Sequence, residues 1–458
     1  MNGNVGAPNL LPLTLALSVL LWIIATTGGH QLFVNEVLGE AFDSQGEHLL
    51  RGDPGVDVSA IRSEAIIVNG KVRTYFGPFP ALFRIPLNLV YPAGRGSWSR
   101  LSGFCAGVLA LFSFAGLVGD GLRASPLSSR ARNWIGNTCV AGFVLATPLL
   151  FLLGNLSIYN EAIIWGLAWG LAGLFFARRS LNNQGRALTY LLLGFSFSAA
   201  AALLSRVTFG MPFLLIAPAL ALRVRQAGWI RLFALAGPLV IGLALYLLLS
   251  YAKFGNFSGV SYENYVDPVH REFVRQHGML NLNRVPYSFV DYFSLRPPAF
   301  RSQPPFVRVD RHFLRHPSFY SIPFSETYLS IPWSSGWLVT GAAFGIICLF
   351  QSNRSDWFQR WIALALFAQF VCILCYFALA QRYTADLYPF LIFCFVVFLG
   401  AGGIVLVRIR HLLIGLVAIS MVINSLATAF WLASDRNLPA ETRMFWSVFA
   451  GKRPVSLK

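Results

Sequence analysis

Acidic residues crowd into one short stretch that follows the first apolar segment of the chain. Seven of the 19 Asp and Glu residues lie there: Glu36, Glu40, Asp43, Glu47, Asp53, Asp57 and Glu64. The first four are spaced four, three and four residues apart, which would place them on one face of a helix. Crowding raises the pKa of a carboxylate, and a raised pKa suits a general base. The alternative is a solvated acidic face in a loop that only connects two membrane spans.

Basic residues follow the acids. Asn69-Gly70 predicts a tight hairpin turn, and this turn would deliver Lys71, Arg73 and Tyr75 just ahead of an apolar, proline-rich piece. Cations at a membrane surface can pair with the phosphate of a bound lipid substrate. The alternative is that these cations only anchor the segment to anionic lipid head groups.

Two further arginines, Arg206 and Arg382, stand at the ends of later apolar segments. Tyr383 is beside Arg382, and Asp386 follows one helical turn later. A guanidinium in this position can hold a phosphate or pyrophosphate with two parallel hydrogen bonds. The alternative is an internal Arg382–Asp386 pair that caps the next helix.

These residues must be positioned by membrane helices. Hydrophobic residues make up 56% of the 458-residue chain and charged residues 12%, against about 25% charged in soluble domains. Runs of about 20 apolar residues recur. We therefore predict an all-α polytopic membrane protein, a single transmembrane domain over residues 1–458. About eleven spans are expected: Asn9–Thr27, Leu101–Leu122, Trp134–Leu153, Tyr159–Ala177, Ala187–Leu204, Phe209–Leu222, Trp229–Tyr251, Gly336–Phe350, Trp361–Ala380, Asp386–Val407 and Leu412–Ala433.

The distribution of arginine orients these spans. Alternate connections hold Arg123, Arg130, Arg132, Arg178, Arg179, Arg186, Arg223, Arg225, Arg231, Arg354, Arg360, Arg408 and Arg410. The short connections on the other side hold only Arg206 and Arg382. Because basic residues favour the cytoplasmic side, we predict a cytoplasmic N-terminus. Two outer loops with short helices, 28–99 and 253–335, and an outer tail, 434–458, would then share the opposite face. Pro78–Tyr91 is expected to be an interfacial helix and not a crossing.

Several function classes lose support. The net charge of +17 does not indicate nucleic-acid binding, because the basic residues occupy short loops and form no long basic face. Acidic residues are absent from the middle of the predicted spans, which disfavours ion-coupled transport. The sequence has no GxxxxGK[ST], HExxH or GxSxG motif. The spacing of the acids matches no strong metal motif, so no metal or other cofactor is predicted. The six cysteines are interpreted as packing residues.

The motifs and their order resemble the GT-C superfamily of integral-membrane glycosyltransferases, which includes protein O-mannosyltransferase-like and aminoarabinose-transferase-like enzymes. In that family the first span is followed by an outer loop with an acidic, often Asp-Glu, motif. Gly39-Glu40-Ala-Phe and the later Glu47-His-Leu-Leu-Arg-Gly-Asp are similar to it. Gly70-Lys-Val-Arg-Thr-Tyr-Phe-Gly-Pro-Phe-Pro-Ala-Leu82 is close to a stretch of the bacterial members. Here Gly39 stands where the family has its first acid.

The resemblance implies transfer of a sugar from a polyprenyl-phosphate donor to a lipid, glycan or protein acceptor, at the outer face of a bacterial inner membrane. Glu40 or Asp43 would be the catalytic base. The donor phosphate would be bound by a basic and aromatic set: Lys71, Arg73, Tyr75, Arg206, Arg382 and Tyr383. Two alternatives are a non-catalytic flippase or polysaccharide-assembly subunit with a degenerate GT-C fold, and a surface-polysaccharide polymerase or ligase that uses Arg and His.

Overall fold

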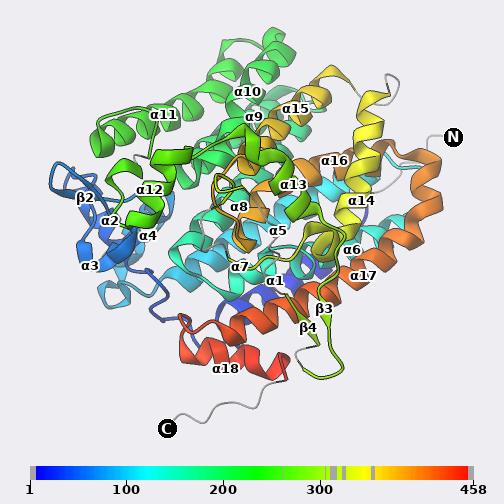
Figure 1. Cartoon of the computed structure of the whole chain (residues 1–458). Coiled ribbons are helices and arrows are strands. Elements are labelled where there is room, and N and C mark those ends of the chain that lie inside the picture. The colour runs from blue at the N-terminus through cyan, green and yellow to red at the C-terminus, as the bar shows by residue number, and fades with distance from the viewer. Residues whose placement is uncertain are drawn as a thin grey trace.

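A computed structural model of the chain describes residues 7–260, 262–304, 306–309, 317–321, 326–351 and 356–451. Arg354 of the predicted arginine set lies outside these residues, as do parts of the predicted loop 253–335 and tail 434–458. Within the described residues the protein is a bundle of long helices with smaller elements gathered at one end (Figure 1).

The long helices are α1 (Leu11–Ala25), α5 (Ser99–Arg123), α6 (Ser129–Leu145), α8 (Ile158–Ser180), α9 (Gly185–Ser205), α10 (Val207–Val224), α11 (Trp229–Phe254), α14 (Ile331–Phe350), α15 (Trp357–Leu374), α16 (Tyr388–Ala401) and α17 (Gly403–Ser434). The smaller elements are α2 (Ala41–Leu50), α3 (Val58–Ile61), β1 (Ile66–Val68), β2 (Lys71–Arg73), α4 (Phe79–Val90), α7 (Leu149–Gly154), η4 (Tyr262–Asn264), α12 (Pro268–His277), α13 (Val285–Phe293), β3 (Ala299–Phe300), β4 (Val307–Arg308), η6 (Gln381–Leu387) and α18 (Ala440–Phe449).

The prediction of a multi-pass membrane protein is confirmed. Among the described residues, nine helices are long and apolar enough to cross a membrane. Two further predicted spans correspond to shorter helices, α1 with 15 residues and α6 with 17. The total of eleven crossings therefore stays a prediction. Helix α4 has 12 residues, which span about 18 Å at about 1.5 Å per residue, too short for a hydrocarbon core of about 30 Å.

Two predicted span boundaries are wrong. The segment Trp134–Leu153 is broken into α6 and α7 at Ala146–Pro148, where proline removes a backbone donor from the helix. The turn expected near Arg408 and Arg410 instead lies earlier, between α16 and α17, where Gly403 has a φ of +53°. Both arginines therefore belong to the first turns of α17 and not to a connecting loop.

The smaller elements form what we call the loop end of the bundle. The predicted hairpin is confirmed: β1 pairs with β2, and Asn69 and Gly70 both have positive φ, as a type I′ turn requires. The long second loop reaches this hairpin through an antiparallel bridge between Ile66 and Tyr265. The two predicted outer loops thus lie at the same end of the bundle. In Figure 1, α12 of the second loop is drawn beside α2 and β2 of the first.

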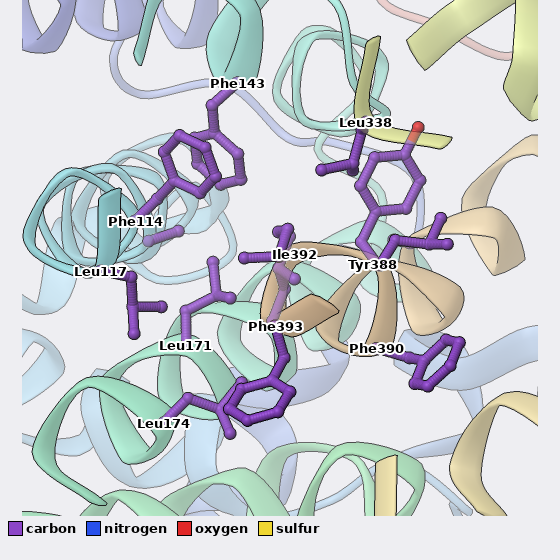
Figure 2. Close-up of a cluster of buried hydrophobic side chains, with 14 of the residues drawn as sticks. Phe114, Leu117, Phe143, Leu171, Leu174, Leu338, Tyr388, Phe390, Ile392 and Phe393 are labelled. Atoms are coloured by element: carbon purple, nitrogen blue, oxygen red, sulfur yellow. The ribbon is translucent and has the colours of Figure 1, made fainter. Parts of the chain in front are cut away.

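The core lies between α5, α6, α8, α14 and α16 (Figure 2). Phe114 stacks on Phe143 with ring centroids 4.3 Å apart. Helices α14 and α16 approach so closely that a Cβ at Gly345 would lie 1.8 Å from the Cys394 carbonyl oxygen. This tight packing gives the loop end a firm base.

Candidate active site

The acidic residues that the sequence places on one helical face diverge in the structure. Helix α2 begins at Ala41, so Glu36 precedes it and Glu40 is its N-cap. Glu36 pairs with Arg100 on α5, with its Oε1 2.7 Å from Nε. Burial raises the pKa of Glu36 despite this guanidinium. The prediction of one acidic face shared by all four residues is therefore wrong, because Glu36 lies before the helix and Asp43 meets a different arginine from Glu40 and Glu47.

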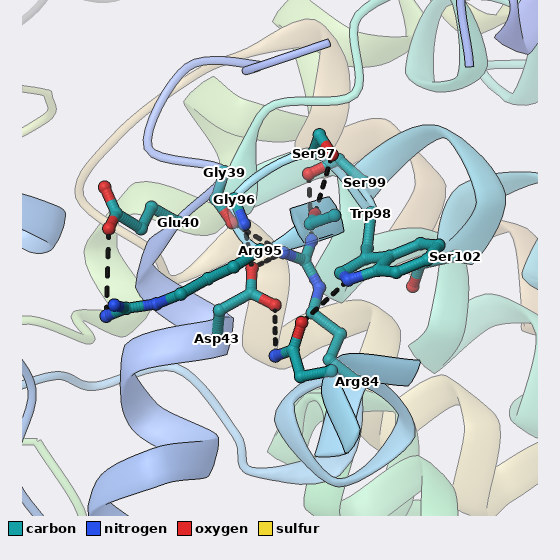
Figure 3. A network of polar contacts seen from close by, with 12 residues as sticks. Gly39, Glu40, Asp43, Arg84, Arg95, Gly96, Ser97, Trp98, Ser99 and Ser102 are labelled. Carbon is teal, nitrogen blue, oxygen red and sulfur yellow. Dashed lines mark hydrogen bonds and ion pairs between the residues drawn. The ribbon is translucent and has the colours of Figure 1, made fainter. Parts of the chain in front are cut away.

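Asp43 is fully buried, and its carboxylate faces the Arg84 guanidinium (Figure 3). Oδ2 accepts from Arg84 Nη1 at 2.5 Å, and Oδ1 accepts from Asn88 at 2.7 Å. The Gly96 N–H also donates to this group, at 3.3 Å. A carboxylate held by this many donors inside the protein has no face turned to a substrate.

Arg84 of α4 joins several elements. Its guanidinium donates to Asp43, to the Gly39 carbonyl oxygen at 2.6 Å and to Ser99 Oγ at 2.8 Å. It also pairs with Glu161 near the start of α8. Arg84 and both acids have fully buried side chains. One cation thus fixes α2, α4, α5 and α8 relative to one another.

Glu40 points the other way from Asp43 in Figure 3. Its side chain is 51% exposed, and the nearest guanidinium nitrogen of Arg95 is 3.8 Å from Oε1. Arg95 also pairs with Glu47 at 2.9 Å and with Asp57 at 3.7 Å. Glu40 is therefore accessible to solvent, at the edge of a cluster formed by Arg95, Glu47 and Asp57.

The two basic residues of the hairpin also differ in their surroundings. The Lys71 side chain is exposed, whereas Arg73 is buried and donates to Asp53 Oδ1 at 2.8 Å. The hydrogen bond from Arg73, with help from His48, lowers the pKa of Asp53 to about 2. Arg73 is thus already committed to a carboxylate.

Replacing Asp53 with Asn is expected to destabilise the protein only slightly. The side chain is 43% exposed, and exposed ion pairs contribute about 0–1 kcal/mol. Because its folded-state pKa is depressed, the contribution is complete above the unfolded pKa near 4 and is lost as the pH falls toward 2. Thermal unfolding of the wild type and Asp53→Asn in detergent should therefore differ at pH 6 and converge near pH 2.

Tyr75 turns toward Glu64, an acid that the sequence counted but did not select. The Tyr75 hydroxyl donates to Glu64 Oε2 at 2.8 Å, and the Tyr265 hydroxyl donates to the same oxygen at 2.5 Å. Tyr159 of α8 lies near the same carboxylate. Burial raises the pKa of both Tyr75 and Tyr265, so the phenols stay protonated and donate to the carboxylate.

The two arginines at helix ends converge on Tyr383. The Arg206 and Arg382 guanidinium carbons lie 5.4 and 5.1 Å from the centroid of its ring. Arg206 Nε pairs with Asp386 at 3.0 Å, while Arg382 pairs with Glu326 of the long loop. The expected alternative of an Arg382–Asp386 pair is therefore wrong, because each arginine takes its acid from elsewhere in the chain.

An apolar groove of about 320 Å³ opens between α9, α10, α11 and α15. Its walls carry aliphatic residues such as Leu203, Met211 and Leu249, and its polar end carries Arg206 and Lys253 with several tyrosines. Lys253 is 5% exposed. Its Nζ donates to the carbonyl oxygens of Thr74 at 3.0 Å and Phe76 at 3.2 Å. No carboxylate of the described chain pairs with it.

A second, larger cavity of about 610 Å³ lies at the loop end. Tyr159 and Arg382 line this cavity, and Tyr75 and Arg206 line the groove. The Arg382 guanidinium carbon is 4.5 Å from the centroid of the Tyr159 ring. Tyr75 donates to Glu64 and Tyr159 lies near it, so this carboxylate sits between a residue of the groove and a residue of the cavity.

Two residues described above, Lys253 and Glu64, were not among the site residues predicted from the sequence. Lys253 is one of four lysines in the chain and stands at the end of an apolar run, which is a usable signal. Glu64 carried no signal beyond its membership of the acidic stretch. Within the described ranges, no group of three or more His, Cys, Asp or Glu side chains could hold a metal ion.

No protein-family model and no curated protein matches the chain. Similar solved structures include ArnT from Cupriavidus metallidurans bound to undecaprenyl phosphate (15% identity, 95% of this chain and 67% of that chain, TM-score 0.48) and the same protein in the apo state (13%, 95% and 84%, TM-score 0.34). Both TM-scores are below 0.5, so this likeness carries no conclusion about function.

Proposed function

We propose that the protein is a glycosyltransferase that moves a sugar from a polyprenyl-phosphate donor to an acceptor. The loop end would face the outer side of a bacterial inner membrane, as the arginine distribution predicts. Lys253 carries the proposal: it is a buried cation without an acidic partner in the described chain, at the polar end of an apolar groove. Burying an unpaired charge is costly, and a bound phosphate would compensate it.

The groove has an apolar part for the isoprenoid chain of such a donor and a polar end for its phosphate. Its aliphatic walls between α10, α11 and α15 would hold the first isoprene units. Lys253 and Arg206 would hold the phosphate, and the Tyr262 and Tyr376 hydroxyls, 3.0 Å apart, would lie beside them. When the bond between the anomeric carbon and the phosphate oxygen breaks, the oxygen takes the electron pair. Fixed cations stabilise the charge that develops there.

Glu64 is the proposed general base. The acceptor hydroxyl would attack the anomeric carbon and pass its proton to Glu64, directly or through Tyr159. A tyrosine hydroxyl can accept one hydrogen bond while donating another, so Tyr159 can relay the proton. We assign Asp43 a positioning role through Arg84. Glu40, which is half exposed, stands as the competing candidate that the sequence favoured.

The other predicted donor residues take supporting places in this proposal. Tyr75 lines the groove and donates to Glu64. Tyr383 separates Arg206 from Arg382, and Arg382 lines the second cavity. Arg73 holds the hairpin through Asp53, and the exposed Lys71 would meet lipid head groups.

Replacing Lys253 with Met is expected to weaken binding of a short-chain polyprenyl phosphate by about 10- to 100-fold. Hydrogen bonds to a charged group contribute about 1.5–3 kcal/mol. The measurement is titration of the purified protein in detergent, followed by intrinsic fluorescence or calorimetry.

Lys71→Met is the matched control, because Lys71 is exposed and lies outside the groove. Its affinity should stay near that of the wild type. Thermal unfolding of both variants separates loss of binding from loss of fold. A folded Lys253→Met protein that binds the lipid as tightly as the wild type would show that the groove is not the donor site.

A further inference from the structure

The larger cavity differs in chemistry from the groove. It is bounded by the α7–α8 junction, the end of α17 and the residues around Glu326. Its volume of about 610 Å³ falls in the range of ligand sites, about 300–1,000 Å³. The proposed donor groove is mainly apolar, with aliphatic and aromatic walls. This cavity instead combines amide, hydroxyl, charged and aromatic side chains.

Its charged side chains balance. Arg308 and Arg382 contribute two positive charges, and Glu326 and Asp435 contribute two negative charges. Arg382 and Glu326 pair with each other. The described part of this lining therefore has no excess positive charge to attract a phosphate, unlike the end of the groove at Lys253. Electrostatics thus favour an uncharged ligand here.

Several polar atoms of the lining residues have hydrogen-bonding capacity to spare. Asn160 is 1% exposed, and its Oδ1 has no hydrogen-bond partner, while its Nδ2 donates to the Asn155 carbonyl oxygen at 2.6 Å. Asn155 Oδ1, Arg382 Nε and Trp431 Nε1 are likewise buried and without a partner. Buried polar atoms are rarely left unsatisfied, so a ligand with many donors and acceptors would complete them.

Trp431 adds an aromatic surface to these polar atoms. It packs edge-on against Phe151, with ring centroids 5.6 Å apart, and both residues line the cavity. A sugar ring presents an apolar C–H face and a rim of hydroxyls. An indole with a free N–H beside amide groups can contact both.

We propose that this cavity binds the acceptor, and that the acceptor is a neutral, hydroxyl-rich glycan. The inference rests on the proposed glycosyltransferase function and deepens it. The reacting hydroxyl would lie next to Tyr159, which lines the cavity and lies near Glu64. The acceptor would therefore approach from one side of the tyrosine pair and the donor from the other. An acceptor whose recognised part is a phosphate or a uronate does not fit this lining.

The test is binding of the purified full-length protein to immobilised oligosaccharides in three sets: neutral, uronate-containing and phosphorylated. The wild type should bind members of the neutral set. Trp431→Ala should lower this binding by at least about tenfold, because it removes the aromatic surface (about 1.4 kcal/mol is tenfold). Asn437→Ala, at the cavity rim, is a second variant that leaves the buried packing intact.

Lys253→Met and a short-chain polyprenyl phosphate separate this inference from the proposed function. Lys253→Met should keep glycan binding, and Trp431→Ala should keep lipid binding. If no neutral glycan binds, or only charged glycans bind, the acceptor inference is overturned. Normal binding of the lipid at the groove would then leave the proposed function standing. Neutral glycan binding that neither cavity variant reduces would place the glycan elsewhere and also overturn the inference.

Discussion

Glu64→Gln is expected to lower the rate of sugar transfer by about 10²- to 10⁴-fold, the usual contribution of a general base. Gln is close to Glu in shape and can still accept a hydrogen bond from a tyrosine hydroxyl, but it cannot take the acceptor proton. Affinity for the polyprenyl phosphate should change little, because Glu64 does not line the groove. The measurement is transfer from the native lipid-linked donor pool of host membranes, together with lipid binding by the purified variant.

Glu40→Gln is the matched control. The Glu40 carboxylate is half exposed, and its nearest cation is as far as 3.8 Å away. Exposed ion pairs of this kind contribute little free energy. The loss of the charge should therefore leave the rate within about twofold of the wild type. Tyr159→Phe removes the proposed relay. The double variant Tyr159→Phe/Glu64→Gln should be no slower than Glu64→Gln alone, since residues that act as a unit are not additive. An inactive Glu40→Gln beside an active Glu64→Gln would return the base to Glu40.

Arg84→Met is expected to destabilise the protein by about 3–5 kcal/mol, the typical cost of removing one partner from a buried ion pair. Asp43 and Glu161 would then face each other inside the bundle without a cation, and the Gly39 carbonyl oxygen would lose its donor. Arg84→Lys should recover only part of the loss, because an ammonium cannot reproduce the planar fork that reaches four acceptors. Unfolding in detergent provides the measurement.

Asp43→Asn separates a structural role of Asp43 from a catalytic one. Arg84 keeps Glu161 in this variant, and the introduced amide would keep the shape of the site. The expected destabilisation is about 1.5–3 kcal/mol, the worth of a hydrogen bond to a charged group, with sugar transfer retained. A well-folded Asp43→Asn protein that transfers no sugar would contradict the positioning role and make Asp43 catalytic.

Local features were predictable because each depends on neighbours in the chain. Asn69-Gly70 predicted the hairpin since both residues tolerate positive φ. The proline-rich Pro78–Tyr91 predicted a helix too short to cross. The helix breaks at Pro148 and Gly403 were harder, because both lie within continuous apolar sequence, where hydropathy marks the presence of helix but not its interruption.

The sequence by itself determined the class of protein, the approximate membrane helices and the presence of acids and bases near their ends. Apolar runs, turn residues and arginine asymmetry act over short stretches and need no tertiary contact. Only the tertiary structure decided which charges meet. Arg84 reaches Glu161 across 77 residues, Lys253 reaches Thr74 across 179, and Arg206 reaches Asp386 across 180. Helix packing sets these partners, and spacing along the chain carries no information about which helix faces come together. For that reason the crowded acids Glu40 and Asp43 separated, while Glu64 came to lie between the groove and the cavity.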